Sequence, residues 1–374
     1  NNFKIKHIIL HVKMNLDFNG LISLLFVTLI VIIIAKKKAS IASILYVALG
    51  LRLLVIVFFQ NILILPDSYG DTTVFENRAY EWSQGGFYNA LNNFPGVNSR
   101  FLSWLMALLY SLFGRSEIMA QSISLLFAMG SIFMAIIIAE KIWDKSSAKK
   151  VGWILAFFPT IVLYSTLFTR EPYSWFFLLT ALYGIVRWSQ DRGLSSLLIT
   201  LIGFTVATFF HGGLLLGGLI FLIFIMFVNI KELLKAAIIL KISFISIFLF
   251  IFILSVVIFL TNYVDSIPKL HSFKEMLDVN LILKEISYRN IKSAAYPEWT
   301  IPTDGIDLIF KAPIRIVYFI FSPFPWDINK LSHIIGFLDS ICYILLFILL
   351  TKNFKKIIND PTLKIIFLIL ACYL

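Results

Sequence analysis

Acidic side chains gather where the chain leaves its second long apolar run. The stretch PDSYGDTTVFENRAYEW, Pro66–Trp82, holds Asp67, Asp71 and Glu76. A carboxylate at the end of an apolar segment is partly desolvated, which raises its pKa and suits it to accept a proton as a general base. Asp71 follows the conformationally free Gly70 and is the leading candidate for this catalytic role. Asp67 and Glu76 are lesser candidates, and the alternative for all three is a solvated loop acid or a helix N-cap.

Basic side chains stand at turns between other apolar runs. Arg170 lies in the TREP turn, and a guanidinium group there suits a phosphate. His211 lies in the HGG turn, where it would bind phosphate or shuttle a proton. Arg100 and Arg289 are further candidates for binding a donor phosphate. The alternatives are an arginine that extends to the membrane interface and an interfacial histidine with one hydrogen bond.

Aromatic and polar residues mix in the longest polar loop, 261–306. Tyr296 and Trp299 lie there, and Trp326 lies in the later segment FSPFPWDI. A sugar would stack on such rings and hydrogen-bond to polar neighbours, so these three residues and Glu171 are candidates for binding a sugar or an acceptor. The same mixture is typical of an aromatic belt at a membrane interface.

The composition indicates what must position these residues. Of 374 residues, 59% are hydrophobic and only 14% are charged, and the mean hydropathy is +0.90. Soluble domains are less apolar and more charged. We expect an all-α fold, a polytopic transmembrane helical bundle forming a single domain over residues 1–374. Ten spans are predicted, at 21–35, 41–64, 118–139, 151–168, 172–188, 194–210, 212–230, 233–260, 331–350 and an incomplete one from 362. The last one leads us to expect a truncated C-terminus.

Positive charge predicts the orientation of these spans. The net charge is +11, but the Lys and Arg residues cluster in short loops, which is typical of cytoplasmic loops and excludes nucleic acid as the expected partner. These loops are KKK, EKIWDKSSAKK, RWSQDR, KELLK and KNFKK. The scheme requires 101–113 and 308–322 to be interfacial or re-entrant helices. Loops 65–117 and 261–306, which carry the candidate residues, then lie on the extracytoplasmic face.

Several motifs are absent from the sequence. It contains no glycine-rich phosphate loop, HExxH, CxxC or GxSxG motif, so ATP hydrolysis, zinc proteolysis and serine hydrolysis are not expected. Cys342 and Cys372 lie in apolar runs and are expected to pack as small core residues. No metal ligands are assigned. The cofactor is unknown, and although a divalent cation bridging Asp71 and a donor phosphate is compatible with the sequence, no ligand set requires one.

Two resemblances to known families follow from longer stretches. DTTVFENRAYEWSQGGFYN, then RFLSWLMALLYSLFGRS, then GWILAFFPTIVLYSTLFTREPYSW and the apolar run after it occur in one order within 65–190. This order resembles the C-type integral-membrane glycosyltransferases that use polyprenyl-phosphate sugars. The resemblance implies that Asp71 occupies the catalytic acid position. The spacing of Arg170 and His211 is similar to that in O-antigen and exopolysaccharide polymerases. An additional span before the acidic loop departs from the first family and favours the second.

The expected function is transfer of a sugar from a polyprenyl-(di)phosphate carrier to a glycan or glycolipid acceptor, in cell-surface polysaccharide biosynthesis. The expected partners are that donor, the acceptor and membrane lipid, and the implied location is the inner membrane of a bacterium. The alternatives are a repeat-unit polymerase and a flippase or other transporter. A flippase should carry basic residues along its spans, and this chain is expected to keep its charges at their ends. A purely structural membrane subunit predicts that Asp71, Arg170 and His211 lie far apart.

Overall fold

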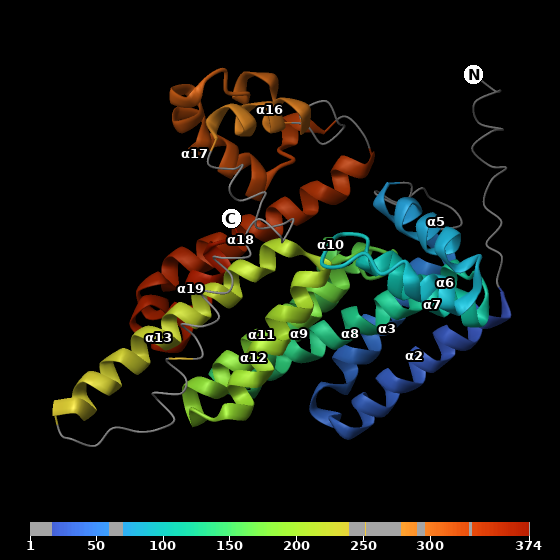
Figure 1. Cartoon of the computed structure of the whole chain (residues 1–374), viewed down its shortest axis with the longest axis horizontal. Helices are drawn as coiled ribbons and strands as arrows, with labels where there is room; N and C mark the ends of the chain where they lie inside the picture. The colour runs from blue at the N-terminus through green and yellow to red at the C-terminus, as the bar shows by residue number, and fades with distance from the viewer. Residues whose placement is uncertain are drawn as a thin grey trace. The chain divides into compact units, whose positions relative to one another are not determined.

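The described part of the chain is helical. A computed structural model describes residues 17–59, 70–238, 251, 278–289, 296–328 and 331–373, and within these ranges every regular element is a helix (Figure 1). The chain divides into two compact units. The first unit comprises Asn1–His211 with Lys330–Ile335, and the second comprises Gly212–Asn329 with Gly336–Leu374.

The first unit contains both long and short helices. They are α2 Phe18–Lys37, α3 Ala42–Leu54, α5 Asp71–Ser83, α6 Gly86–Asn92, α7 Phe101–Phe113, α8 Glu117–Ile142, α9 Lys145–Phe157, α10 Pro159–Tyr164, α11 Glu171–Asp191 and α12 Leu194–Phe210. A five-residue π-helical turn, Val55–Phe59, continues α3. The single predicted span 151–168 is therefore two helices. Pro159 cannot donate a backbone hydrogen bond and keeps Phe158 extended, so the helix is interrupted there.

Four of the described helices are long and apolar enough to cross a membrane, namely Phe18–Lys37, Ala39–Val57, Glu117–Ile142 and Gly336–Asn359. Four shorter apolar helices accompany them, Phe101–Phe113, Leu194–Phe210, Gly212–Val228 and Pro361–Ala371. The all-helical fold class is confirmed, and the apolar helices are compatible with a membrane protein. The count of ten spans stays a prediction.

The second unit contains its own set of helices. They are the 3₁₀ turn η3 Gly212–Leu214, α13 Leu215–Ile238, α16 Val279–Arg289, η5 Glu298–Thr300, α17 Gly305–Phe321, η6 Pro325–Asp327, α18 Leu331–Asn359 and α19 Pro361–Ala371. The first residues of α18, up to Ile335, are assigned to the first unit. The hydroxyl of Tyr373 donates to the Leu214 carbonyl at 3.2 Å and ties the end of α19 to the start of α13. The predicted segment 308–322 coincides with α17. Ile309 and Phe310 on this helix are 72% and 79% exposed.

Two loops predicted in this unit are wrong. Lys231–Lys235 lies inside α13, and the KNFKK segment lies inside α18. Lys, Glu and Leu are good helix formers and neither segment contains Gly or Pro, so nothing interrupts the backbone hydrogen bonds. The stop comes only at Asp360, whose carboxylate caps α19 ahead of Pro361. Most of the predicted span 233–260 lies outside the described residues.

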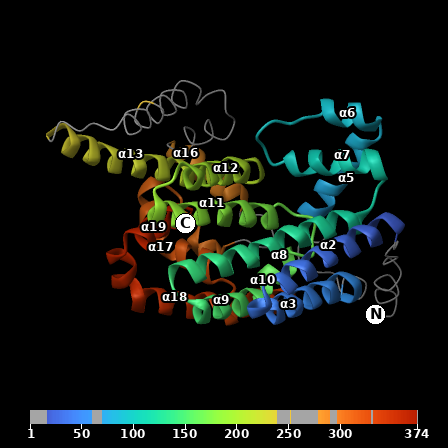
Figure 2. The same cartoon turned by 90° about the horizontal axis from the view of Figure 1, so that it is seen from below.

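Two contacts show which ends of the helices in the first unit lie together. The Ser116 hydroxyl donates to Asp17 at 2.9 Å, so α2 and α8 begin side by side. The Gln190 amide donates to the Lys141 carbonyl at 3.5 Å, so α8 and α11 end side by side. Figures 1 and 2 both show α5, α6 and α7 at the end where α2 and α8 begin. Acidic α5 and the basic loops after α2, α8 and α11 thus lie at opposite ends of the unit, and the orientation of these ends in a membrane stays a prediction.

Helices α11 and α12 approach each other closely through glycine. A Cβ atom built on Gly203 would lie 2.6 Å from the Ala181 backbone nitrogen, and one on Gly184 would lie 2.6 Å from the Thr200 backbone nitrogen. Small residues let two helices in a membrane pack backbone to backbone. This contact holds together the two helices that carry Arg170 and His211 at their ends.

Gly203→Ala is expected to destabilise the protein by about 1–3 kcal/mol, because the added methyl group must push the backbones of α11 and α12 apart. Thermal unfolding in detergent measures the effect. Gly50→Ala on α3 is the matched control, since a Cβ there meets nothing within 4 Å. The control should unfold at the same or a higher temperature because alanine favours a helix. Equal effects of the two substitutions would contradict this packing argument.

Candidate functional site

Asp71 and Arg170 lie together at one end of the first unit. Asp71 is the first residue of α5, and Arg170 is the residue before α11. An Arg170 Nη2 atom is 3.7 Å from Asp71 Oδ2, which is an ion pair but too long for a hydrogen bond. The Asp71 side chain is 68% exposed and that of Arg170 is 22% exposed. The leading base candidate and the leading phosphate candidate are therefore neighbours, although they are 99 positions apart in the sequence.

A cluster of aromatic rings lies next to Arg170. The Arg170 guanidinium lies 5.3 Å from the centre of the Phe75 ring. Phe75, Tyr173 and Phe210 belong to one buried cluster contributed by α5, α7, α8, α11 and α12. The Tyr173 and Phe210 rings stack at 5.0 Å, and Phe210 meets Phe101 at 5.4 Å. The cluster therefore draws the starts of α7 and α11 and the end of α12 to the same place.

Arg100 and His211 are sequence neighbours of two rings of this cluster. Arg100 directly precedes Phe101 and is exposed, and His211 directly follows Phe210, is exposed and ends α12. Both therefore lie at the same end of the first unit as Arg170. Glu171 is half-buried in the first turn of α11, where the helix dipole stabilises a negative charge.

Unsatisfied polar atoms concentrate around the pair. Seven described residues carry a buried side-chain nitrogen or oxygen without a hydrogen-bond partner. Six of them come from the starts of α5, α7 and α11, namely Thr72, Ser103, Trp104, Thr169, Arg170 and Ser174. Buried polar groups are nearly always hydrogen-bonded, so each exception calls for a ligand, a water or strain. Sequence reasoning missed these hydroxyls because isolated Ser and Thr residues in apolar runs give no pattern.

Glu76 lies in a different environment from Asp71. It is only 4% exposed, and its two carboxylate oxygens accept from Arg115, one bond being 2.9 Å from Nε. The Tyr110 hydroxyl also donates to Glu76, at 3.1 Å. Burial, and then the negative charge of Glu76, raise the pKa of Tyr110. This carboxylate fastens α5 to α7 and to the turn before α8.

That turn is the LFGRS segment. Gly114 has φ +85°, a conformation that favours glycine, and it redirects the chain after α7. Arg115 then reaches back to Glu76, and the Ser116 hydroxyl accepts from the Met119 backbone as the cap of α8. Sequence reasoning singled out the turn but not Arg115 as the partner of Glu76, because their 39-residue separation leaves no local signal.

The aromatic candidates belong to the second unit. The Tyr296 ring lies under the Arg315 guanidinium at 4.2 Å. Trp299 is 60% exposed and meets the edge of Tyr318 at 6.0 Å. Arg315 donates to the Thr300 carbonyl at 3.2 Å, which holds the 296–300 segment on α17.

Three further candidates complete the set. Trp326 is 72% exposed and stacks on Phe324 at 4.9 Å, in a Pro-rich segment where no α-helix forms. Arg289 is the last residue of α16, and its side chain lies outside the described atoms. Asp67 also lies outside the described residues.

The sequence analysis missed two buried groups within apolar helices. Arg52 in α3 is fully buried and donates to the carbonyls of Ala48, Leu155 and Ala156 at 3.0–3.2 Å. The expectation that charges stay at the span ends is therefore wrong. Pro159 explains one of these hydrogen bonds. It has no N–H group to donate to the Leu155 carbonyl four residues earlier, so that carbonyl at the end of α9 accepts from Arg52. Asp339 in α18 is only 6% exposed, and an acid in an apolar helix is itself a signal of function.

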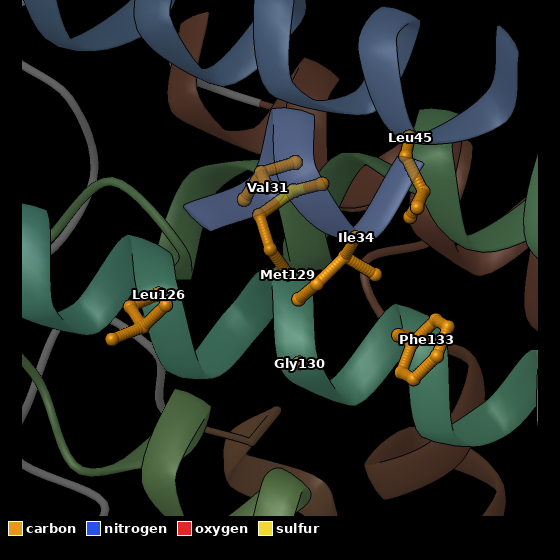
Figure 3. Close-up of a pocket in the computed structure, with 7 residues that line it drawn as sticks. All are labelled: Val31, Ile34, Leu45, Leu126, Met129, Gly130 and Phe133. Carbon is orange, nitrogen blue, oxygen red and sulfur yellow. The ribbon is translucent and has the colours of Figure 1, made fainter. Parts of the chain in front are cut away.

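Neither a metal cluster nor an apolar cavity adds to the site. Among the described residues, no three His, Cys, Asp or Glu side chains lie close enough to hold a metal ion. A cavity of about 40 Å³ lies between α2, α3 and α8 and is lined by apolar side chains that include Ile34, Leu45 and Met129 (Figure 3). No family model, curated protein or solved structure matches the chain.

Proposed function

We propose that the protein is an integral-membrane glycosyltransferase that moves a sugar from a polyprenyl-(di)phosphate carrier to an acceptor hydroxyl on the extracytoplasmic face. One observation carries the proposal. An exposed carboxylate, Asp71, faces the guanidinium of Arg170 at 3.7 Å, at an end of an apolar helical bundle where unsatisfied polar atoms collect. A lipid-linked sugar has the same layout, with a tail in the membrane and an anionic phosphate at its edge.

The residues have separate roles in this reaction. The acceptor oxygen attacks the anomeric carbon, while the bond between that carbon and the phosphate oxygen breaks. Asp71 takes the proton of the acceptor hydroxyl. The electron pair of the broken bond leaves on the phosphate, whose charge Arg170 neutralises, with His211 and Arg100 as further cationic or hydrogen-bonding groups at the same end. That Tyr296, Trp299 and Trp326 bind a sugar or an acceptor stays a prediction.

The family proposed for this chemistry is the C-type glycosyltransferases, and the repeat-unit polymerases remain the alternative with the same donor. The placement of Arg170 and His211 at one end of the first unit supports the polymerase as well. The 3.7 Å distance between Asp71 and Arg170 weighs against a purely structural subunit, which predicts that they lie far apart. A flippase has little support from Arg52, because that guanidinium already donates to three backbone carbonyls.

A donor panel tests the proposal. Purified protein in lipid nanodiscs is given polyprenyl-phosphate and polyprenyl-diphosphate sugars with glycan acceptors, and release of the lipid phosphate is measured. We expect release from at least one donor, only when an acceptor is present, and the length of the product separates single transfer from polymerisation. The contradictory result is no release from any donor, combined with movement of an intact lipid-linked sugar across proteoliposome membranes, which would favour the flippase.

A further inference from the structure

The first turn of α11 offers unused hydrogen-bond donors. Arg170 is its N-cap residue, and no side chain caps the helix. Pro172 has no N–H group, so the N–H groups of Arg170, Glu171 and Tyr173 are the ones that the helix itself leaves unpaired. The positive end of the helix dipole lies at the same point, and together these features favour an anion.

Two buried hydroxyl groups flank this helix start. Thr169 is 2% exposed and Ser174 is 8% exposed, and neither hydroxyl has a hydrogen-bond partner among the described residues. Side chains in a helix tilt toward its N-terminus, so the Ser174 side chain leans toward Arg170. Two other buried hydroxyls of the first unit, on α8 and α12, are satisfied. Ser122 donates to the Ile118 carbonyl and Thr208 to the Phe204 carbonyl, both at 2.7 Å.

Arg170 itself also has unused donors. Its side chain makes no hydrogen bond within the described part of the chain, its Nε atom is buried, and its ion pair with Asp71 is 3.7 Å long. Arg115 shows the contrast, because its guanidinium makes three hydrogen bonds to Glu76 and Asn77. The protein therefore occupies three donors of Arg115, whereas no donor of the Arg170 side chain is hydrogen-bonded to a described residue.

We infer that Thr169, Arg170, Ser174 and the first turn of α11 form a phosphate cradle, and that a bound phosphate replaces Asp71 on Arg170. The inference rests on the proposed function for the identity of the ligand, a prenyl phosphate. A phosphate oxygen only accepts hydrogen bonds, and the cradle offers a guanidinium, two hydroxyls and free N–H groups. The exposed Asp71 carboxylate is then released from Arg170 and is free to meet the acceptor hydroxyl. The base thus becomes available when the donor is in place.

Binding measurements without any sugar or acceptor test the cradle. Farnesyl phosphate is titrated against the purified protein in detergent, with farnesol as the probe that lacks the phosphate. Thr169→Val and Ser174→Ala are each expected to weaken farnesyl phosphate binding by about tenfold or more, the scale of a hydrogen bond to a charged group, and to leave farnesol binding unchanged. The matched controls are Thr208→Val and Ser122→Ala, which remove satisfied hydroxyls and should leave phosphate binding as in the wild type.

The unfolding temperature gives a second readout. Without ligand, Thr169→Val and Ser174→Ala should unfold at the same or a higher temperature than the wild type, because each removes an unsatisfied buried group. The two controls should unfold at lower temperatures. Phosphate binding that stays at the wild-type level in Thr169→Val and Ser174→Ala overturns the cradle, and so does equal binding of farnesol and farnesyl phosphate.

Two further arms test the exchange and the source of the phosphate. Asp71→Asn should bind farnesyl phosphate about threefold more tightly, because the phosphate no longer competes with the Asp71 carboxylate for Arg170. A threefold change is about the scale of an exposed ion pair. Glu81→Gln on the same helix is the control and should not change the affinity. Unchanged affinity in Asp71→Asn overturns the replacement of Asp71 by phosphate.

Phosphatidic acid is the probe for a bilayer phospholipid. If it binds as tightly as farnesyl phosphate, and if Thr169→Val and Ser174→Ala weaken its binding too, the cradle is supported with a phospholipid as its occupant. Failure of sugar transfer leaves these binding results intact, so the two proposals fail separately.

Discussion

Asp71→Asn is expected to lower the rate of glycosyl transfer by about a hundredfold or more, which is the scale at which loss of a general base is felt. The amide keeps the size of the carboxylate but does not take the proton of the acceptor hydroxyl. The protein should remain folded, because Asp71 is 68% exposed and its contact with Arg170 is too long for a hydrogen bond. Release of lipid phosphate under single-turnover conditions measures the loss.

Two controls make this result specific to Asp71. Glu81→Gln removes an exposed carboxylate from the same helix and should retain the wild-type rate. Farnesyl phosphate binding by Asp71→Asn shows that the donor site is intact, so that a slow rate reports on chemistry. Full activity in Asp71→Asn would mean that Asp71 is only a loop acid, and the resemblance to the C-type glycosyltransferases would then fail at its central residue.

The apolar runs of the sequence predicted many of the helices. Runs such as 194–210 and 118–139 become α12 and α8 almost unchanged, because a long apolar run without Gly–Pro breaks has one stable backbone state in a membrane. The same rule failed where charge was taken as the end of a helix. Lys and Glu are compatible with helix, so α13 and α18 continue through their charged segments.

From the sequence, only the helix ends that carry the candidate site could be predicted. Asp71 and Arg170 follow apolar runs, and alternation of the helices brings such ends together, so their proximity could be anticipated. The partner of Glu76 could not, because Arg115 reaches it through the fold of a turn set by Gly114. Nor could the roles of Thr169 and Ser174, since whether a hydroxyl is satisfied depends on the packing around it.

The two arginines near α5 have different roles. We assign Arg115 to stability and Arg170 to ligand binding. Arg115 donates to a carboxylate whose side chain is only 6% exposed, whereas Arg170 donates to no described partner and stands beside an exposed carboxylate. A buried and fully paired carboxylate has no free lone pair directed at a substrate. We therefore assign Glu76 to holding α5 in place, and the catalytic proposal depends on Asp71.

Arg115→Met is expected to destabilise the protein by about 3 kcal/mol, because it leaves the Glu76 carboxylate buried without its cationic partner. Glu76→Gln should cost less, about 1–2 kcal/mol, since the amide keeps the shape and a hydrogen bond to Arg115. The double variant should be no less stable than Arg115→Met alone, because no buried charge remains. Unfolding in detergent at constant pH measures all three proteins, and the coupling energy between the two sites follows from them.

The same variants decide whether Glu76 is a base. If the carboxylate holds α5, the rate of transfer by folded Glu76→Gln should stay within a few fold of the wild type, and restored stability in the double variant should restore the yield of active protein. A general base would give the opposite pattern, with stable Glu76→Gln protein that has lost about a hundredfold in rate. Additive destabilisation by the two single substitutions would contradict the pairing, because a contact between two groups that stabilises the fold cannot be lost twice.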